Sequence, residues 1–206
     1  MNIAVFASGR GSNFLAILDA IESGNIRNAR IVLAMSNNSD AGALTIAREH
    51  NILALHLSRK QFDSDEAFNN VLLTTLGHNG VNFIVLAGYM KKLDPLVIQR
   101  YKNRIVNIHP ALLPAFGGEG MYGMHVHEAV VASKAKFSGA TVHIVDEEYD
   151  RGPIVLQKSV KVAADETPES LAEKIRAIEH EIYPATIRLF AEGKVMVNGQ
   201  RVTIVN

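Results

Sequence analysis

The chain has 206 residues, of which 48% are hydrophobic, and its formal net charge is zero because 21 basic residues balance 21 acidic ones. This length and apolar share indicate one substantial domain with an ample core, and the balanced charge excludes the global basic field that recruits nucleic acid. Cysteine is absent, which excludes disulfides, thiolate catalysis and Cys-ligated zinc. Neither a membrane-spanning run nor a signal peptide is recognisable, so we expect a cytoplasmic protein without a membrane partner.

The first half of the chain alternates apolar strands with amphipathic helices. Residues 2–7 form a near-continuous apolar run, which is typical of a strand buried on both faces. Such alternation indicates an α/β fold with a doubly wound, mostly parallel sheet and a Rossmann-like N-terminal half. Helices are predicted over residues 14–22, 41–50, 62–77 and 95–100, and further strands over 30–35, 53–57, 82–87 and 104–108.

The loop at residues 8–13, Ser-Gly-Arg-Gly-Ser-Asn, joins the first strand to the first helix. This arrangement places backbone N–H groups and the positive end of a helix dipole at one spot, which suits an anion. A dinucleotide site would need a third glycine and an acid after the second strand, where residues 36–38 are Ser-Asn-Asn. A single phosphate therefore fits better, although the glycines could also serve only to make the turn.

The stretch 107–114, Asn-Ile-His-Pro-Ala-Leu-Leu-Pro, follows directly from a predicted strand. Side chains alternate along a strand, so Asn107 and His109 project to the same side, and Pro110 ends the ladder just beyond them. An amide donor beside a side chain that titrates near neutral pH suits a reaction in which a carbonyl oxygen becomes negative. The alternative is that this pair caps a helix or satisfies a buried backbone group.

Three segments near this stretch have less specific patterns. Residues 88–92, Gly-Tyr-Met-Lys-Lys, follow the fourth strand, and from the residues alone a core methionine with solvated lysines is favoured. Residues 115–124 hold four glycines and no periodicity, which suits either a mobile flap or a surface loop. His125 and His127 have no third ligand nearby, so they make a poor metal site and are predicted to be structural or substrate-facing, before a helix over 128–133.

The last third of the chain changes pattern, with two long strands predicted over 140–145 and 154–162 and an acidic turn between them. A carboxylate held near His109 would keep its imidazolium charged and fix its orientation. Asp150 is the best candidate because Gly-Pro at 152–153 pins the backbone just beyond it, although most acid clusters only aid solubility.

A capped helix is predicted from residues 167–170 to about 183, continuing past Pro184 towards 190, and a hairpin is predicted over 195–205 around Asn-Gly. Arg176 and Glu179 lie three residues apart on one face of this helix. From the residues alone they are interpreted as a surface ion pair.

Six pieces of the sequence, in order, resemble the phosphoribosylglycinamide formyltransferase family, and the resemblance covers essentially the whole chain. Each piece is modest by itself, and their order makes the match specific. The pieces are Ser-Gly-Arg-Gly-Ser-Asn at 8–13, Leu-Ala-Gly-Tyr-Met at 86–90, the stretch 107–114, Gly-Ala-Thr-Val-His at 139–143, Asp-Arg-Gly-Pro at 150–153 and Glu-His-Glu-Ile-Tyr-Pro at 179–184.

The resemblance implies transfer of a formyl group from 10-formyltetrahydrofolate to the amine of glycinamide ribonucleotide, in purine synthesis. It also implies a single formyltransferase domain over residues 1–206, with a phosphate-binding half at 1–100 and a catalytic, folate-binding half at 101–206. The fold would end in an antiparallel C-terminal extension. The implied partners are these two small molecules, with no metal and no nucleic acid.

The resemblance implies three groups of site residues. Asn107, protonated His109 and Asp150 would stabilise the tetrahedral oxyanion and move protons, with His143 in support. The substrate would contact Gly11, Ser12, Asn13, Gly88, Pro110, Arg176 and Glu179. The folate would contact Met90, Lys91, Lys92, Leu93, Asn107, Asp146, Glu147, Glu148, Tyr149 and Asp150.

Two positions depart from the family pattern. Asp65 stands where a basic residue that reaches the folate tail is often found, so that contact is in doubt. Lys91 stands where an arginine is common, which keeps the charge but loses the bidentate fork. Neither position belongs to the implied chemical core.

Three other functions compete with the implied one. A methionyl-tRNA formyltransferase would need a further RNA-binding domain, for which the chain is too short and too balanced in charge. A formyltetrahydrofolate deformylase would transfer the formyl group to water, and it typically carries an extra N-terminal domain. A non-catalytic nucleotide-binding module would explain the glycine loop but not the convergence of Asn107, His109 and Asp150.

Overall fold

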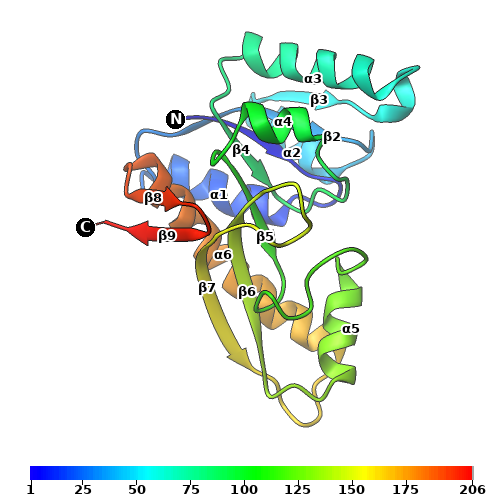
Figure 1. Ribbon diagram of the computed structural model, residues 1–206, viewed down its shortest axis with the longest axis vertical. Helices are drawn as coiled ribbons and strands as arrows, with labels where there is room; N and C mark the ends of the chain where they lie inside the picture. The colour runs from blue at the N-terminus through cyan, green and yellow to red at the C-terminus, as the bar shows by residue number, and fades with distance from the viewer. Residues whose placement is uncertain (206) are drawn as a thin grey trace. The chain divides into compact units, whose positions relative to one another are not determined.

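A computed structural model describes residues Met1–Val205. The chain divides into two compact units, Met1–Val106 and a second one that begins at Asn107. Figure 1 follows the chain from blue at the N-terminus to red at the C-terminus. Among the described residues, no helix is both long and apolar enough to cross a membrane.

The first unit is built on four parallel strands in the order β3-β2-β1-β4. The central strands are apolar on both faces, and Ile3, Ala4, Val5 and Phe6 are at most 1% exposed, as a strand covered by helices on both sides requires. The strands are β1 (Asn2–Phe6), β2 (Arg30–Ser36), β3 (Leu53–His56) and β4 (Phe83–Leu86), and the helices are α1 (Ser12–Glu22), α2 (Gly42–Glu49), the short 3-10 turn η1 (Arg59–Gln61), α3 (Asp65–His78) and α4 (Pro95–Arg100).

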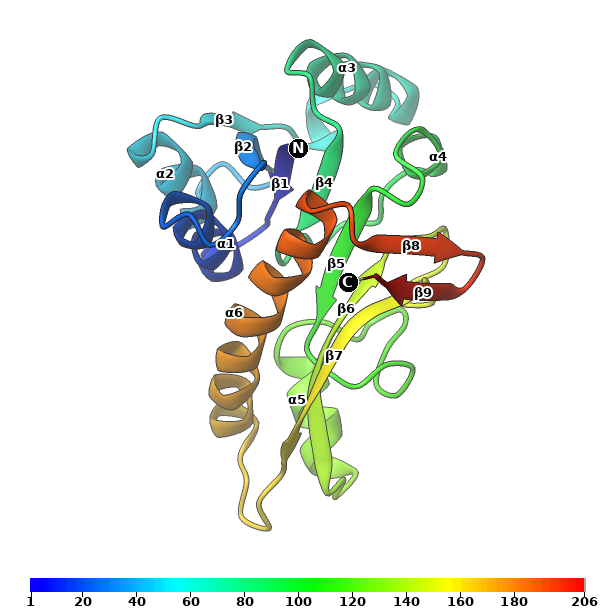
Figure 2. The ribbon, with the colours of Figure 1, turned by 90° about the vertical axis from the view of Figure 1, so that its left-hand side faces the viewer.

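The strand β5 (Ile105–His109) begins in the first unit and ends in the second. In the second unit, β6 (Phe137–Ile144) pairs antiparallel with β7 (Ile154–Lys161), and β8 (Val195–Asn198) forms a hairpin with β9 (Arg201–Ile204). The helix α5 (Met124–Ala132) and the long helix α6 (Pro168–Ala191) complete the unit. Figure 2 shows α6 running along β6 and β7, against which it packs its buried residues, including Leu171, Ile175 and Tyr183.

The predicted α/β class, with a mostly parallel sheet and an antiparallel C-terminal extension, is confirmed. Several boundaries differ from the prediction. The first helix begins at Ser12 rather than at residue 14, because Gly11 adopts a left-handed conformation (φ 84°) that lets the helix start directly after it. The third begins at Asp65 rather than at 62, because the hydroxyl of Ser64 accepts a hydrogen bond from the N–H of Ala67 and caps it there.

Of the two helices of the second unit, α5 is longer than predicted and α6 has about the predicted extent. The helix α5 begins at Met124, four residues before the predicted start, so His125 and His127 lie within it. The helix α6 runs without interruption to Ala191, with Pro184 inside it. Its start matches the prediction, since the Thr167 side chain accepts a hydrogen bond from the Ser170 N–H and Pro168 occupies the first turn.

Candidate active site

The glycine loop of the first unit presents the N-terminus of α1. Gly11 is the N-cap, and it has no side chain that could accept a hydrogen bond from the first turn. That turn begins with Ser12 and Asn13. No acidic side chain lies in that turn to neutralise the helix dipole. A Cβ at Gly11 would lie 2.9 Å from the Cα of Ala43, so the close approach of α1 and α2 requires glycine there. These features suit a phosphate group.

Ser8, the first residue of this loop, fixes the segment that follows β4. Its N–H donates to the carbonyl of Gly88 (3.0 Å), and its hydroxyl accepts a hydrogen bond from the N–H of Met90 (2.8 Å). The same hydroxyl donates to Oδ1 of Asn37, which follows β2. Ser8 therefore ties together the carboxyl ends of three parallel strands, a role that sequence reasoning missed because its partners lie in two other segments, after β2 and after β4.

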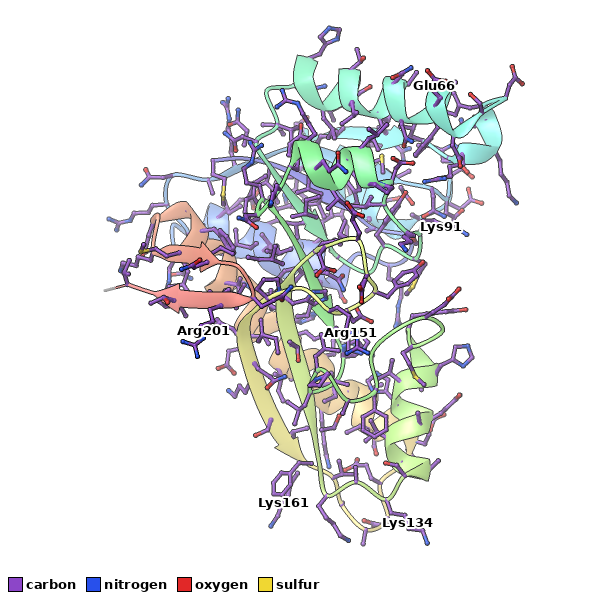
Figure 3. The ribbon with its side chains drawn as sticks, in the orientation of Figure 1. Glu66, Lys91, Lys134, Arg151, Lys161 and Arg201 are labelled. Atoms are coloured by element: carbon purple, nitrogen blue, oxygen red, sulfur yellow. The ribbon has the colours of Figure 1, made fainter. Side chains whose placement is uncertain are left out.

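The candidate folate residues after β4 point mostly to solvent. Met90 is 47% exposed, so the interpretation of this side chain as a core methionine is wrong. Lys91 and Lys92 are exposed, and Figure 3 shows the Lys91 side chain at the surface, whereas Leu93 is buried. Tyr89 packs its ring edge-to-face against Phe6 (5.5 Å between centroids), and burial raises the pKa of its hydroxyl to about 12. The segment is thus anchored by Tyr89 and Leu93 and exposes Met90 between them.

The catalytic candidates all lie in the second unit. The strand β5 delivers Asn107, which is half-buried, and His109, which is 3% exposed. Pro110, half-buried, ends the strand as predicted. The following turn is held by Thr141, whose hydroxyl donates to the carbonyl of Ala111 (2.6 Å) and accepts the N–H of Leu113 (3.1 Å). Thr141 was not predicted, although it lies two residues from His143 on the same face of β6.

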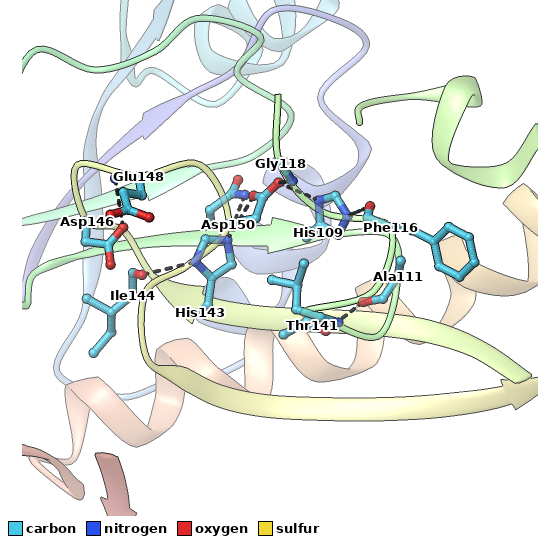
Figure 4. A network of polar contacts seen from close by, with 12 residues as sticks. His109, Ala111, Phe116, Gly118, Thr141, His143, Ile144, Asp146, Glu148 and Asp150 are labelled. Carbon is cyan, nitrogen blue, oxygen red and sulfur yellow. Dashed lines mark hydrogen bonds and ion pairs between the residues drawn. The ribbon is translucent and has the colours of Figure 1, made fainter. Parts of the chain in front are cut away.

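Asp150 lies between two histidines, as Figure 4 shows. Its Oδ2 is 3.5 Å from Nδ1 of His109, and its Oδ1 is 3.4 Å from Nε2 of His143. Oδ2 also accepts a hydrogen bond from the N–H of Gly118 (2.9 Å). Asp150 adopts a left-handed conformation (φ 56°), which aspartate tolerates better than most residues, and its side chain is 10% exposed. The other members of the turn, Asp146, Glu147, Glu148 and Tyr149, are half-buried or exposed.

His143 connects Asp150 to Asn107. Its Nε2 lies 3.2 Å from the amide nitrogen of Asn107, and its Nδ1 lies 3.0 Å from the carbonyl of Ile144. An amide nitrogen only donates, so a bare Nε2 accepts from Asn107, whereas a protonated Nε2 donates to Asp150. His143 is buried, at 2% exposure, and so holds both of its partners in a fixed orientation.

Burial and the neighbouring charges and hydrogen bonds have opposite effects on the pKa values of His109 and Asp150. Burial lowers the pKa of His109, although the charge of Asp150 and the carbonyl of Phe116 act to raise it. Burial acts to raise the pKa of Asp150, yet hydrogen bonding from His143, the charge of His109 and the N–H of Gly118 bring it below its usual value. Asp150 is therefore ionised, and burial works against the protonated His109 that we expected.

Two backbone groups of the glycine-rich loop complete the network. The carbonyl of Phe116 lies 2.8 Å from Nε2 of His109, and Gly118 supplies the N–H that Asp150 accepts. Neither was predicted, because backbone groups leave no mark in the residue types of a sequence.

The helix α6 places Arg176 and Glu179 in half-buried positions. Burial lowers the pKa of His127, and the charges of His109 and Arg176 lower it further. Burial and Arg176 likewise lower the pKa of His180. Arg176 thus acts on the buried His127 and the half-buried His180 and is not a fully exposed surface residue. His125, in contrast, is 62% exposed and pairs with Glu128 at 3.4 Å.

Within residues Met1–Val205, no group of three or more histidine, aspartate or glutamate side chains is arranged to hold a metal ion. The side chains of the network offer hydrogen bonding and proton transfer. An amide donor, a histidine and a carboxylate gathered around β5 can stabilise an oxyanion and move a proton.

Comparison with known proteins agrees with this chemistry. Residues 1–187 match the family model described as formyl transferase. The chloroplastic phosphoribosylglycinamide formyltransferase of Arabidopsis thaliana is 42% identical over 94% of this chain, which spans only 66% of that relative's length. The structure of glycinamide ribonucleotide transformylase 1 from Symbiobacterium toebii is 40% identical with a TM-score of 0.93, covering 100% of this chain and 94% of that one. A formyltetrahydrofolate deformylase structure from Pseudomonas syringae is 26% identical with a TM-score of 0.88, covering 100% of this chain and 66% of that one.

Proposed function

We propose a reaction for this chain on the basis that it belongs to the formyl transferase family. Its relatives include phosphoribosylglycinamide formyltransferases. The reaction transfers the formyl group of 10-formyltetrahydrofolate to the amine of glycinamide ribonucleotide, a one-carbon step of de novo purine biosynthesis. The co-substrate is the folate, and no metal takes part.

The observation that carries this proposal is the placement of Asp150 between His109 and His143, with Asn107 on the other side of His143. A merely structural histidine on β5 would need one hydrogen-bond partner. Instead, four side chains from β5, β6 and the turn after β6 form one connected and largely buried network. Its parts are those that acyl transfer requires: an amide donor, a proton carrier and a carboxylate that orients it.

In the proposed mechanism, the substrate amine attacks the formyl carbon and the carbonyl electron pair moves onto oxygen. Asn107 and His109 donate hydrogen bonds to this oxyanion. The negative charge raises the proton affinity of His109 as it develops, and the ionised Asp150 stabilises the imidazolium, so the effect of burial is offset when the proton is needed. A water relays the proton from the new ammonium to the folate nitrogen, which leaves as the carbonyl re-forms.

The remaining site residues bind the two substrates. Backbone groups of Gly11, Ser12 and Asn13 hold the phosphate at the start of α1. Arg176 and Glu179 assist at the phosphate and the ribose hydroxyls, and Gly88 and Pro110 also contact this substrate. The folate is bound by Met90, Lys91, Lys92 and Leu93 and by the turn Asp146, Glu147, Glu148 and Tyr149.

We further propose that both units belong to one formyltransferase domain, that the protein acts in the cytoplasm, and that it has no nucleic-acid or membrane partner. The departures at Asp65 and Lys91 alter contacts with the folate tail and leave the catalytic network unchanged. Asp65 pairs with Arg59 at 2.7 Å, so its carboxylate is already engaged by a cation.

The test is whether folate product appears only when the acceptor is present. The purified protein is incubated with 10-formyltetrahydrofolate with and without glycinamide ribonucleotide, and tetrahydrofolate, formate and formylated product are quantified. We expect tetrahydrofolate and formylated product in equal amounts, and none without acceptor. Release of formate without acceptor would identify a deformylase, which the deformylase similarity makes the second candidate. Binding without turnover would identify a non-catalytic module.

A further inference from the structure

The hydrogen bond between His109 and Phe116 decides which ring nitrogen of His109 carries a fixed proton. The carbonyl oxygen of Phe116 lies 2.8 Å from Nε2. A carbonyl oxygen only accepts hydrogen bonds, so Nε2 must be the donor and must keep its hydrogen. In the neutral ring, the other nitrogen, Nδ1, is then without a proton.

The surroundings of Nδ1 differ from those of Nε2. Its neighbour is Oδ2 of Asp150 at 3.5 Å, too far for a firm hydrogen bond but close enough to stabilise a positive ring. Oδ2 is already held by the N–H of Gly118 at 2.9 Å. Nδ1 is therefore the less firmly engaged nitrogen, and a proton that arrives there finds a carboxylate beside it.

We propose that Phe116 is a positioning residue for the transfer: its backbone carbonyl fixes the proton on Nε2 of His109 and leaves Nδ1 as the nitrogen that takes up a solvent proton when the ring becomes charged and returns it to solvent after the carbonyl re-forms. The catalytic role of Nδ1 in this inference rests on the proposed function, whereas the tautomer of His109 does not. In this arrangement it is Nδ1–H, and not Nε2–H, that is available to donate to the formyl oxygen when His109 is charged, with Asp150 stabilising the imidazolium.

The backbone around Phe116 is built to aim this carbonyl. Phe116 has φ 56°, the left-handed region that a bulky residue rarely adopts. A Cβ on the next residue, Gly117, would lie 2.4 Å from Cδ2 of Leu113 and 3.2 Å from Cβ of Asp150, so a larger residue there would have to displace the buried Leu113 side chain. The following N–H, from Gly118, is held by Asp150. Asp150 thus holds the loop that carries the carbonyl through Gly118, and it places its charge 3.5 Å from Nδ1 of His109.

The protonation of His109 responds to four groups. Asp150 and the Phe116 carbonyl favour the charged ring, and His143 opposes it, as does burial. His127 on α5 is the remaining titratable neighbour, and its own pKa is lowered in part by His109. Because the Phe116 carbonyl favours the charged ring, its loss lowers the pKa of His109 further.

The first test needs no substrate. Long-range ¹⁵N–¹H correlation spectra of the ligand-free protein, with His109 assigned by its absence in His109→Gln, report the tautomer of the neutral ring. We expect the Nε2–H tautomer. The Nδ1–H tautomer would overturn the proposal. If formyl transfer is absent but Nε2–H is found, the proposed function fails and the hydrogen bond stands, so the two failures are distinguishable.

The second test compares Phe116→Asn with Phe116→Val. Both remove the ring, but asparagine tolerates the left-handed conformation, whereas a β-branched side chain does not. We expect Phe116→Asn to keep kcat within about threefold, and Phe116→Val to lose about tenfold or more in kcat with little change in KM, because the carbonyl swings away from Nε2. In Phe116→Val the kinetic pKa of His109 moves to lower pH.

Equal kcat in the two variants would overturn the proposal. Equal impairment would assign the role to the ring, and equal retention would show that neither the ring nor the backbone conformation at this position affects turnover. Thermal unfolding of both variants identifies any loss due to folding. If Phe116→Val does not fold, the tautomer of the unmodified protein still decides the question.

Discussion

Under the proposed function, the glycine loop of the first unit and the histidine network of the second would bind different kinds of charge in different ways. The loop Gly11–Asn13 uses consecutive residues, and its working groups are backbone N–H groups at the start of one helix. The network joins side chains of Asn107, His143 and Asp150, which lie up to 43 positions apart, and adds the backbone of a separate loop. A permanent anion needs only fixed dipoles, whereas a charge that appears during reaction needs groups that exchange protons.

This difference predicts that the largest loss comes from the network. His109→Ala removes the proton carrier and one donor to the oxyanion, so turnover falls by about 10²–10⁴-fold while the fold is retained. Steady-state kinetics with both substrates measures the loss. His125→Ala is the matched control, because that histidine is 62% exposed on α5 and should leave the rate unchanged. A His109→Ala enzyme with near-normal kcat would remove His109 from the mechanism.

The loop, in contrast, should respond to backbone changes rather than to loss of polar side chains. Gly11→Ala forces an alanine into φ 84° and against Ala43, at a cost of about 1–3 kcal/mol, and it displaces the start of α1. We expect KM for glycinamide ribonucleotide to rise about tenfold or more, with a smaller effect on KM for the folate. Gly9→Ala, where a Cβ meets nothing within 4 Å, is the control. Equal effects at the two glycines would contradict this account.

A further prediction concerns the contacts of Glu166 at the start of α6, which join residues close together in the sequence. Glu166 accepts hydrogen bonds from Lys174, Ser170 and the N–H of Ala163, and these contacts lower the pKa of its carboxyl to about 2. Glu166→Gln should destabilise the fold by about 1–2 kcal/mol at neutral pH. The folded-state pKa is below the unfolded one, so this contribution is present above about pH 4.5 and is lost as pH falls towards 2. The free energy of unfolding in urea, measured for Glu166→Gln and for the control Glu173→Gln at an exposed position, tests this prediction.

The smallest expected effect is a pH dependence of stability that comes from the second unit. Burial is the first cause of a lowered pKa in His109, His127 and His180. The folded state therefore binds fewer protons than the unfolded state, and stability falls as pH drops below about 6.5. The melting temperature measured from pH 8 to pH 5 should decline, and His127→Gln should flatten the decline. A melting temperature that rises over this range would contradict the shifts.

These contrasts explain what the sequence could and could not predict. The strands and the glycine loop follow from local apolar runs and glycines, and strand alternation predicted that Asn107 and His109 project to the same side of β5. The choice of Asp150 rested on the Gly-Pro that follows it. The exposure of Met90, however, depends on two tertiary contacts that the local sequence does not reveal. One is the hydrogen bond from its N–H to Ser8, and the other is the packing of Tyr89 against Phe6. The early start of α5 could not be predicted, because the glycine-rich segment before it shows no helical periodicity.

The contribution of Phe116 was not predictable at all. It comes from a backbone carbonyl, and its direction is set by a φ value unusual for a bulky residue. Residue type alone suggested only a mobile flap or a surface loop. Functional groups supplied by the main chain become visible only when the tertiary structure fixes the dihedral angles around them.

The central claim is that His109 and Asp150 act as one catalytic unit, and a double-mutant cycle tests it most directly. The kcat of His109→Ala, Asp150→Asn and the combined variant is measured under saturating substrates, with folding verified for each. Because Asp150 acts through His109, we predict that the double variant is no slower than His109→Ala alone. Losses that multiply, so that the double variant is slower by the product of the two single effects, would show that the two residues act independently and contradict the account.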